Sequence, residues 1–448
     1  MSSSLSSLVQ DPRLAGVEAV ECVTPDLNGI PRGKIMTPEG FLEGRRLQMA
    51  RGVLFQCVMG GYPPPRYYGG DDGDLVLAPD LGQLHRLPWS EQPRALVICD
   101  AQEADGVPCL LSTRSLLRRV LQEYAGEGLR PVVASELEFF LFEPNPDPLR
   151  PFEPPRGLDG RTSDAAGAFS VSANQGHQAY FDEVYAAMRA FGLPRDTFLH
   201  EMGASQFEIN LLHGDALQAA DQTFLFKHLL REIALRHGLI AVCMAKPLAG
   251  TPGSSMHLHQ SLVRLDDGSN VFSDGEGGET PVFRHFIGGL QAALGDLTLL
   301  FAPYVNSYQR LFHPFASPNN ACWGYDNRAA GLRIPLSGPA ARRVENRLPG
   351  ADANPYLVIA ASLAAGLRGM RLQLEPTGPV QGEFEAPPAM QLPFTLSAAL
   401  ERLQQSELAR ELCGEAFIDG YVATKLMELG SYYDEITPWE RRHLAPWV

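Results

Sequence analysis

The first hundred residues alternate short apolar runs with turn-forming residues, a pattern typical of β-strands. The segment Asp26-Leu-Asn-Gly29 lies between two apolar runs and predicts a tight turn between two strands. A glycine- and proline-rich loop at 60–73 separates this pair from further short strands. The expected strands are 17–24, 30–37, 75–77 and 95–99.

The apolar positions change to helical spacing from Ser112 onward. Leu116 and Val120 recur on one helical face behind this serine, which is a favourable N-cap. We therefore expect an N-terminal domain over 1–108 and a C-terminal domain over 109–448. Helices alternate with short strands in the second domain. The expected helices are 178–192, 215–237, 281–299, 354–372, 395–407 and 410–428.

Four expected strands each present one polar face. In the strand 133–142, the alternation of side chains puts Glu136 and Glu138 on the same side. The same alternation groups Glu208 with Asn210 on 206–211, His257 with His259 and Ser261 on 256–261, and Arg343 with Glu345 and Arg347 on 343–347.

A polar strand face has two interpretations. It is commonly the solvated side of an antiparallel sheet, but these faces concentrate Glu, His and Arg rather than the Lys and Thr of a solvated surface. With Glu201 just upstream, five carboxylates and one or two imidazoles could converge. Such a sulfur-free set suits Mg²⁺ or Mn²⁺ better than Zn²⁺. Two such ions are the usual device for neutralising a phosphoryl group in transfer.

Arginines are concentrated between residues 310 and 347. They predict either surface ion pairs or a clamp for phosphates and a carboxylate. The sequence has no Walker A motif and no G-x-G-x-x-G motif, so neither familiar glycine loop would bind a nucleotide. The segment 250–255 is an ordinary turn or a substrate-contacting loop. The arginines are Arg310, Arg328, Arg333, Arg342, Arg343 and Arg347.

Charge and cysteine content narrow the class of protein. Asp and Glu total 52 against 37 Lys and Arg, and the net charge of −15 disfavours binding to nucleic acid or to an anionic membrane. Seven scattered cysteines without a C-x-x-C pair fit a reducing compartment. Since no signal peptide or long apolar stretch is apparent, we expect a cytoplasmic protein.

At this point the chain resembles the glutamine synthetase family, type I branch, over nearly its whole length. The resemblance implies an α+β fold with a small N-terminal β-grasp-like domain and a larger catalytic domain, in which helices flank a curved antiparallel sheet. It also implies a homo-dodecamer of two hexameric rings with active sites between subunits. The matching motifs are Asp26-Leu-Asn-Gly-Ile-Pro-Arg-Gly-Lys34, Ser135-Glu-Leu-Glu-Phe-Phe140, Gly253-Ser-Ser-Met-His-Leu-His-Gln-Ser-Leu262, Asn306-Ser-Tyr-Gln-Arg310, Arg343-Val-Glu-Asn-Arg347 and Asn354-Pro-Tyr-Leu357.

The family uses ATP to phosphorylate the γ-carboxylate of glutamate, and ammonia then displaces the phosphate. The resemblance implies two or three Mg²⁺ or Mn²⁺ ions and a role for each matching residue. Glu138, Glu201 and Glu208 would hold one ion, and Glu136, His257 and Glu345 another. For glutamate, Arg310 would bind the α-carboxylate, Arg347 would stabilise the γ-carboxylate, and Gly253 would lie against the substrate. For ATP, the phosphates would be bound by Arg328, Arg333 and Arg343, and Ser261 would lie near the adenine. Of these, Arg310, Arg347 and Glu345 are the expected catalytic residues.

Two positions depart from the family pattern. Ala316 stands where the family's flap carries a glutamate, and the place of the ammonium-binding aspartate falls near Gly60. Without these acids a bare ammonium ion loses the charges that would recognise it, unless Asp71 and Asp72 replace them. The chain thus resembles the γ-glutamylpolyamine synthetase-like branch, whose acceptor is an organic amine.

Several alternatives stay open from the sequence. They are an ammonia-using glutamine synthetase, a ligase for aromatic or hydroxylated amines, a non-catalytic family member, and a zinc hydrolase. The acceptor's identity is open too. Tyr62, Tyr67 and Tyr68, with Asp71 and Asp72, form either a cage for a distant ammonium group or an ordinary loop. His313 or a water molecule are the candidates for taking the amine proton.

Overall fold

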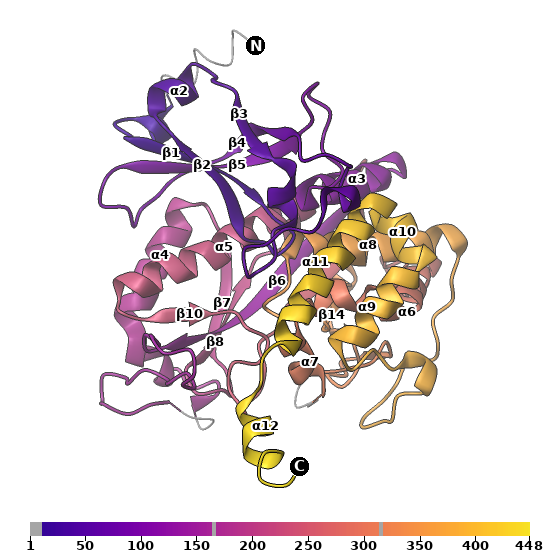
Figure 1. Ribbon diagram of the computed structural model, residues 1–448. Helices are drawn as coiled ribbons and strands as arrows, with labels where there is room; N and C mark the ends of the chain where they lie inside the picture. Colours follow the sequence, from indigo (N-terminus) through magenta and orange to yellow (C-terminus); the bar gives the residue numbers. More distant parts are fainter. Residues whose placement is uncertain (1–10, 164–166, 313–316) are drawn as a thin grey trace.

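The computed structural model describes residues 11–163, 167–312 and 317–448. An N-terminal five-stranded sheet, indigo to purple in Figure 1, lies above a larger part built on a second sheet. The strand order of the first sheet is β2-β1-β5-β4-β3, with β1 and β5 parallel and the other neighbours antiparallel. Its elements are β1 (Ala19–Pro25), β2 (Pro31–Met36), α2 (Pro38–Leu42), β3 (Leu47–Ala50), β4 (Asp74–Arg86) and β5 (Arg94–Gln102).

The expected turn at Asp26–Gly29 is confirmed, because it joins β1 to β2. One Asp26 carboxylate oxygen accepts the backbone N–H groups of Asn28 and Ile30, at 2.8 and 2.9 Å. Gly29 has a φ of 73°, which glycine adopts without strain. Sequence reasoning missed the strand β3, since four residues are too few to show an alternating pattern.

The second sheet is mixed but mainly antiparallel, in the order β12-β13-β14-β11-β6-β8-β7, with β9 and β10 also paired to β6. Only the neighbours β12 and β13 among these paired strands run parallel. The expected α+β class with an antiparallel sheet flanked by helices is therefore confirmed. The strands are β6 (Leu129–Phe142), β7 (Arg195–His200), β8 (Gln206–Leu211), β9 (Gly214–Asp215), β10 (Ile240–Val242), β11 (Met256–Arg264), β12 (Trp323–Tyr325), β13 (Leu332–Ile334) and β14 (Val344–Asn346).

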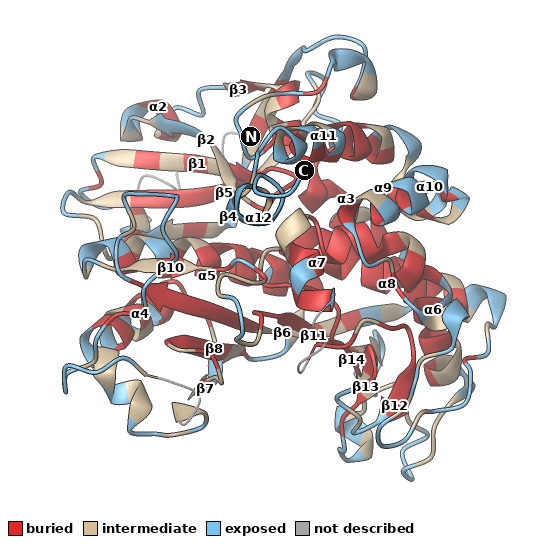
Figure 2. Ribbon diagram, turned by 60° about the horizontal axis from the view of Figure 1, so that its bottom comes forward, coloured by how far each residue is buried: buried red, intermediate tan, exposed pale blue. Residues whose placement is uncertain are grey.

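Helices cover this sheet, and Figure 2 shows that α5, α6 and α8 are largely buried. The backbones of α6 and α8 approach closely where two glycines meet. A Cβ on Gly289 would lie 2.6 Å from the Cα of Gly369, so a larger residue would force the helices apart. The helices are α3 (Thr113–Gly126), α4 (Gln178–Ala190), α5 (Ala216–Arg236), α6 (Pro281–Phe301), α7 (Val305–Phe312), α8 (Pro355–Leu372), α9 (Leu396–Gln405), α10 (Glu407–Cys413), α11 (Glu415–Tyr433) and α12 (Pro438–His443).

The prediction of one helix over 410–428 is wrong. Gly414 has a φ of 94°, outside the helical range, and divides the segment into α10 and α11. The apolar spacing continues on both sides of the break, so periodicity alone could not detect it.

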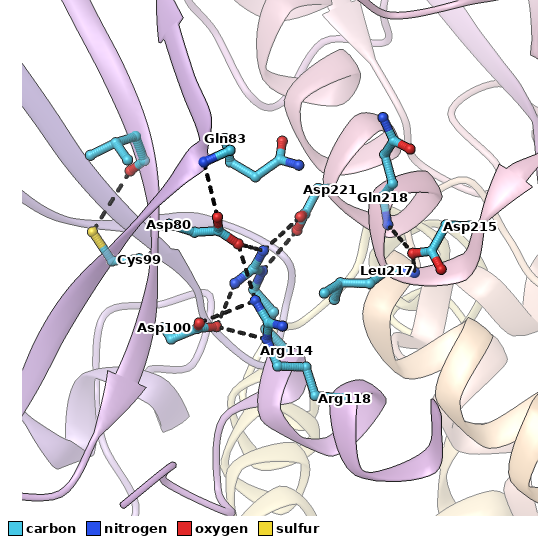
Figure 3. A network of polar contacts seen from close by, with 12 residues as sticks. Asp80, Gln83, Cys99, Asp100, Arg114, Arg118, Asp215, Leu217, Gln218 and Asp221 are labelled. Carbon is cyan, nitrogen blue, oxygen red and sulfur yellow. Dashed lines mark hydrogen bonds and ion pairs between the residues drawn. The ribbon is translucent and has the colours of Figure 1, made fainter. Parts of the chain in front are cut away.

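A buried arginine joins the N-terminal sheet to the helices α3 and α5 (Figure 3). Arg114, at the start of α3, donates to Asp221 of α5 at 2.7 and 2.9 Å. The same guanidinium pairs with Asp80 of β4 at 2.7 Å and with Asp100 of β5. Arg118 adds a second cation one turn along α3, at 3.0 Å from Asp80. The division of the chain into domains at 108–109 stays a prediction, but the ion pairs between the N-terminal sheet and these helices are well defined.

Helices in the described ranges are all too short or too polar to cross a membrane. The first ten residues, on which the expectation about a signal peptide rests, lie outside these ranges. The seven cysteines are all buried and unpaired, which agrees with the absence of a disulfide framework expected from their spacing.

Candidate active site

The registers of four neighbouring strands bring the predicted acidic residues together. Glu136 of β6 lies opposite His257 of β11. On the other side of β6, Glu138 lies opposite Glu208 of β8. Glu345 of β14 completes the row, because β14 pairs with the far edge of β11.

Two groups of side chains in this row have the spacing of metal ligands. Glu136, His257 and Glu345 each place a ligand atom within 4.8 Å of the others, and so do Glu138, Glu208 and His257. His257 belongs to both groups, so the two candidate sites are adjacent. Among the described residues, neither of these two groups includes Glu201. Its assignment to a metal stays a prediction.

Burial and mutual repulsion strain this cluster when it holds no cation. Burial, followed by repulsion from the Glu138 charge, raises the pKa of Glu208 to about 9. Burial and the charge of Glu201 raise the pKa of Glu138 to about 7. Glu201 itself has a raised pKa through burial, and Arg328 partly opposes this shift. A divalent cation would remove the repulsion, so the donor set fits one.

Histidine 257 has the protonation state that metal binding needs. Burial and the neighbouring Arg347 lower the pKa of His257 to about 4, which keeps the imidazole neutral at neutral pH. Its Nδ1 lies 3.3 Å from Glu136 and 3.8 Å from Glu345. Its Nε2 is buried and has no hydrogen-bond partner in the described part of the chain. These features agree with a ligand to Mg²⁺ or Mn²⁺.

Glu345 is the point at which the arginines meet the acidic cluster. Its side chain is fully buried and pairs with Arg333 at 2.7 Å and with Arg347. Although burial opposes the shift, His257 and Arg347 lower the pKa of Glu345 to about 2. A carboxylate at this position therefore stays charged over the physiological range.

Arg310 and Gly253 form a second part of the site. Arg310 is 2% exposed and donates to the Leu348 carbonyl and the Ser255 hydroxyl, each at 2.8 Å. Burial lowers the pKa of Arg310 to about 10, so the guanidinium remains charged at neutral pH. A Cβ on Gly253 would lie 2.8 Å from the Arg310 side chain, which explains a glycine here.

The arginine donors are not all used within the protein. The Nε atoms of Arg310 and Arg347 are buried and have no hydrogen-bond partner among the described residues. Unpaired buried donors are costly, and these two flank Glu138 and Glu345. An anionic ligand could accept their hydrogen bonds.

A cavity of about 590 Å³ opens beside the acidic cluster. Glu136, His259, Ser261, Arg130 and Arg343 are among the residues that line it. Arg343 donates its Nε–H to His259 at 3.1 Å. The structure therefore brings Arg343, Ser261 and Arg333 to the same side of the sheet as the metal groups, while Arg328 is exposed on the loop after β12.

His259, which the alternation of β11 groups with His257, lies 2.8 Å from Glu136, as expected for a second imidazole at the site. Sequence analysis gave no role to two further neighbours of the site. Gln206 donates to Glu138 at 3.2 Å and to the Gly253 carbonyl at 3.0 Å. Asp326 accepts from Arg333 Nε at 3.1 Å. No periodic signal marks the last two, because they act across separate loops and strands.

The loop of residues 55–72, expected near the amine, makes contacts with the protein core and with neighbouring backbone. Tyr68 is 2% exposed and stacks on Phe55, with ring centroids 5.6 Å apart, so it belongs to the core rather than to a cage. Asp72 accepts the Gly52 N–H at 2.6 Å. Tyr62 is exposed. Ala316 and His313 lie outside the described residues.

Comparison with known proteins assigns the family. The sequence profile of "Glutamine synthetase, catalytic domain" matches residues 110–444. The chain belongs to the glutamine synthetase family. A glutamine synthetase of Pyrococcus furiosus is 33% identical over 436 residues, covering 96% of this chain and 93% of the relative.

Other relatives are ligases that use organic amines. The glutamate–isopropylamine ligase of a Pseudomonas species is 33% identical over 441 residues, covering 95% of this chain and 94% of the relative. The γ-glutamylethanolamide synthetase GlnA4 of Streptomyces coelicolor is 32% identical over 438 residues, covering 95% and 92%. A ligand-free GmaS structure superposes with a TM-score of 0.83 at 30% identity, covering 99% of this chain and all of that one. At the family level the chain is a ligase of the glutamate–amine group.

Proposed function

We propose that this protein joins the γ-carboxylate of glutamate to a small organic amine at the expense of ATP. The observation that carries the proposal is the pair of adjacent metal-ligand groups sharing His257, set between the 590 Å³ cavity and the buried Arg310. A hard-cation site between an ATP-sized cavity and a carboxylate-binding arginine is suited to phosphoryl transfer onto a carboxylate.

Each part of the site has a task in the first step. Two or three Mg²⁺ ions, held by the acidic cluster, would neutralise the charge of the transferring phosphoryl group. Arg343 and Arg333 would bind ATP phosphates from the cavity side, with Arg328 at the exposed rim and Ser261 near the base. Arg310 would hold the α-carboxylate of glutamate and Arg347 its γ-carboxylate. A γ-carboxylate oxygen then takes the γ-phosphoryl group, and ADP leaves.

The second step forms the amide. The neutral amine nitrogen attacks the carbonyl carbon of γ-glutamyl phosphate, the C–O bond to phosphate breaks, and phosphate leaves. The nitrogen loses one proton in this step, and His313 or a water molecule stays the proposed acceptor. Arg347 would stabilise the negative charge that develops on the carbonyl oxygen.

The choice of an organic amine over ammonia rests on the two departures from the family pattern. The loop of residues 55–61 carries no acid, and an alanine occupies the flap position. An amine with an alkyl group gains from apolar burial, at ~0.8 kcal/mol per CH₂ group. The relatives named for isopropylamine and ethanolamide support a small monoamine as the acceptor. The proposal also includes polyamines as acceptors. Ammonia-dependent glutamine synthesis is the second candidate, supported by the archaeal relatives.

The proposal includes an assembly and a location. By its family the enzyme would form a dodecamer of two hexameric rings in the cytoplasm, with no nucleic-acid or membrane partner. Light scattering coupled to size-exclusion chromatography tests this part, since a mass of one or two chains would contradict it.

Measurement of ADP formation tests the proposed activity. Full-length protein with Mg²⁺ and ATP should release ADP only when both glutamate and an alkylamine are present, and the product should have the mass of the γ-glutamyl amide. The matched substitution Glu345→Gln should abolish this release while the protein stays folded. ADP release that is independent of glutamate would show that the proposed acceptor is wrong.

A further inference from the structure

A fully buried lysine lies at the junction of the two parts of the molecule. Lys425 is on α11, drawn yellow in Figure 1, and has no exposed side-chain surface. Its ammonium group donates to Asn28 at 2.9 Å and to Glu428 at 2.8 Å. It also lies 4.1 Å from the centre of the Tyr304 ring. The lysine thus binds the turn after β1, its own helix and the residue before α7 together.

On one side, the junction formed by Lys425, Asn28, Glu428 and Tyr304 contacts the loop after β3. Glu428 accepts the Val58 N–H at 3.0 Å. Asn28 donates its side-chain amide to the Gln56 carbonyl at 2.9 Å, and Thr424 of α11 donates to the Phe55 carbonyl at 3.2 Å. Lys425 is bonded to two of these three anchors, so it fixes their relative position.

On the other side, hydrogen bonds connect the junction to the candidate active site. The Tyr304 hydroxyl donates to Asn28 at 2.8 Å, and the Tyr304 N–H donates to the Ser307 hydroxyl at 3.0 Å. Ser307 in turn donates to the partly buried Asp352 at 2.6 Å. Ser307 lies in the first turn of α7, and Arg310 follows one turn later on the same short helix. A continuous bonded path therefore joins Lys425 to the helix that carries Arg310.

We propose that Lys425 is a positioning residue that holds α7 so that Arg310 presents its guanidinium group to glutamate. The inference rests on the proposed role of Arg310 and concerns a residue outside the reacting groups. Loss of the ammonium group would leave the Glu428 carboxylate buried without its partner cation and would free one bond on Asn28. The nucleotide-sized cavity is lined by residues of β6, β8, β11 and nearby loops, which do not belong to this path.

The test separates positioning from a general loss of stability. Lys425→Met should raise KM for glutamate roughly tenfold, whereas KM for ATP should stay at the wild-type value. Because the single variant leaves a buried charge, the double variant Lys425→Met/Glu428→Gln restores neutrality and should show the same rise in KM. Lys34→Met, at an exposed lysine of β2, is the matched control and should behave as wild type.

Two outcomes would overturn the inference. A merely structural lysine would lower the yield of active enzyme and the apparent kcat, with both KM values unchanged. A rise in both KM values together would show a general distortion of the site.

Hydrogen exchange gives a second readout that needs no activity. In both Lys425 variants the amides of 305–312 should exchange faster than in wild type, whereas those of 129–142 in the central strand should not change. If the wild type forms no ADP with glutamate and any amine, the proposed function is wrong. The hydrogen-exchange measurement then still tests whether Lys425 holds α7 in place. Unchanged protection of 305–312 in the double variant would refute the role of Lys425.

Discussion

At the residue scale, Glu345 is the carboxylate on which the metal group and the arginines depend together. Glu345→Gln keeps its shape but removes its charge, so Arg333 and Arg347 lose their anion and the metal loses a ligand. We expect turnover to fall at least ~100-fold. The melting temperature should fall as well, because the buried Arg347 loses its partner charge. Glu138→Ala should have a comparable effect through the other group.

Glu143→Gln, at an exposed glutamate directly after β6, is the control for this substitution and should keep normal turnover. Near-normal activity of Glu345→Gln at unaltered Mg²⁺ would contradict the proposed metal site.

The raised carboxyl pKa values predict a pH dependence of metal binding. Burial and neighbouring carboxylates raise the pKa of Glu208 to about 9 and that of Glu138 to about 7 in the metal-free protein. A cation must therefore displace protons, and its affinity should increase as pH rises from 6 to 9. Calorimetry in buffers of different ionisation enthalpy should show proton release on Mg²⁺ binding. Binding that is independent of pH in this range would show that these carboxylates are not ligands.

At the element scale, the contact between α3 and the N-terminal sheet depends on one buried cation. Arg114→Met would leave Asp221 buried without its partner, with Asp80 and Asp100 close by. We expect the free energy of unfolding to fall by ~3–5 kcal/mol, measured by urea denaturation. Arg118→Met removes a partly exposed charge from the same cluster and should cost ~1 kcal/mol or less. Equal losses in the two variants would contradict this account of the junction.

The sequence of the loop 382–388 predicts how the protein is not regulated. The resemblance to the glutamine synthetase family implies that Phe384 stands at the place of a tyrosine that is adenylylated in bacterial members, and a phenyl ring has no hydroxyl group to modify. We expect no adenylylation of this loop in cells. Peptide mass spectrometry that finds a nucleotidyl group between residues 378 and 394 would contradict this.

The elements also show what periodicity can and cannot predict. Alternation placed Glu136 with Glu138 on one face of β6, and the register of the sheet confirms that the polar faces of β6, β8 and β11 meet. The break at Gly414 stayed hidden because glycine can also continue a helix, and only its φ shows that it does not. The buried state of Tyr68 depends on stacking against Phe55, a contact that no local pattern encodes.

At the scale of the whole molecule, two parts of the chain meet through buried polar groups. The lysine junction and the arginine cluster both join the N-terminal sheet to the helices of the larger part, and neither could be predicted from sequence. Each depends on side chains separated by a hundred residues or more, such as Lys425 with Asn28 and Arg114 with Asp221. The expected roles of the site residues came from the family resemblance. The alternation of polar residues along the strands predicted that these residues lie close together.

The central claim is that the acceptor is an organic amine rather than ammonia. A competition reaction tests it most directly, with ammonium and a three- or four-carbon primary amine at equal free-base concentration, together with glutamate, ATP and Mg²⁺. Burial of the alkyl chain should favour the γ-glutamyl alkylamide over glutamine by ~30- to 200-fold, measured by mass spectrometry of the products. Glutamine formed in an equal or greater amount would contradict the account and would identify the chain as an ammonia-using glutamine synthetase.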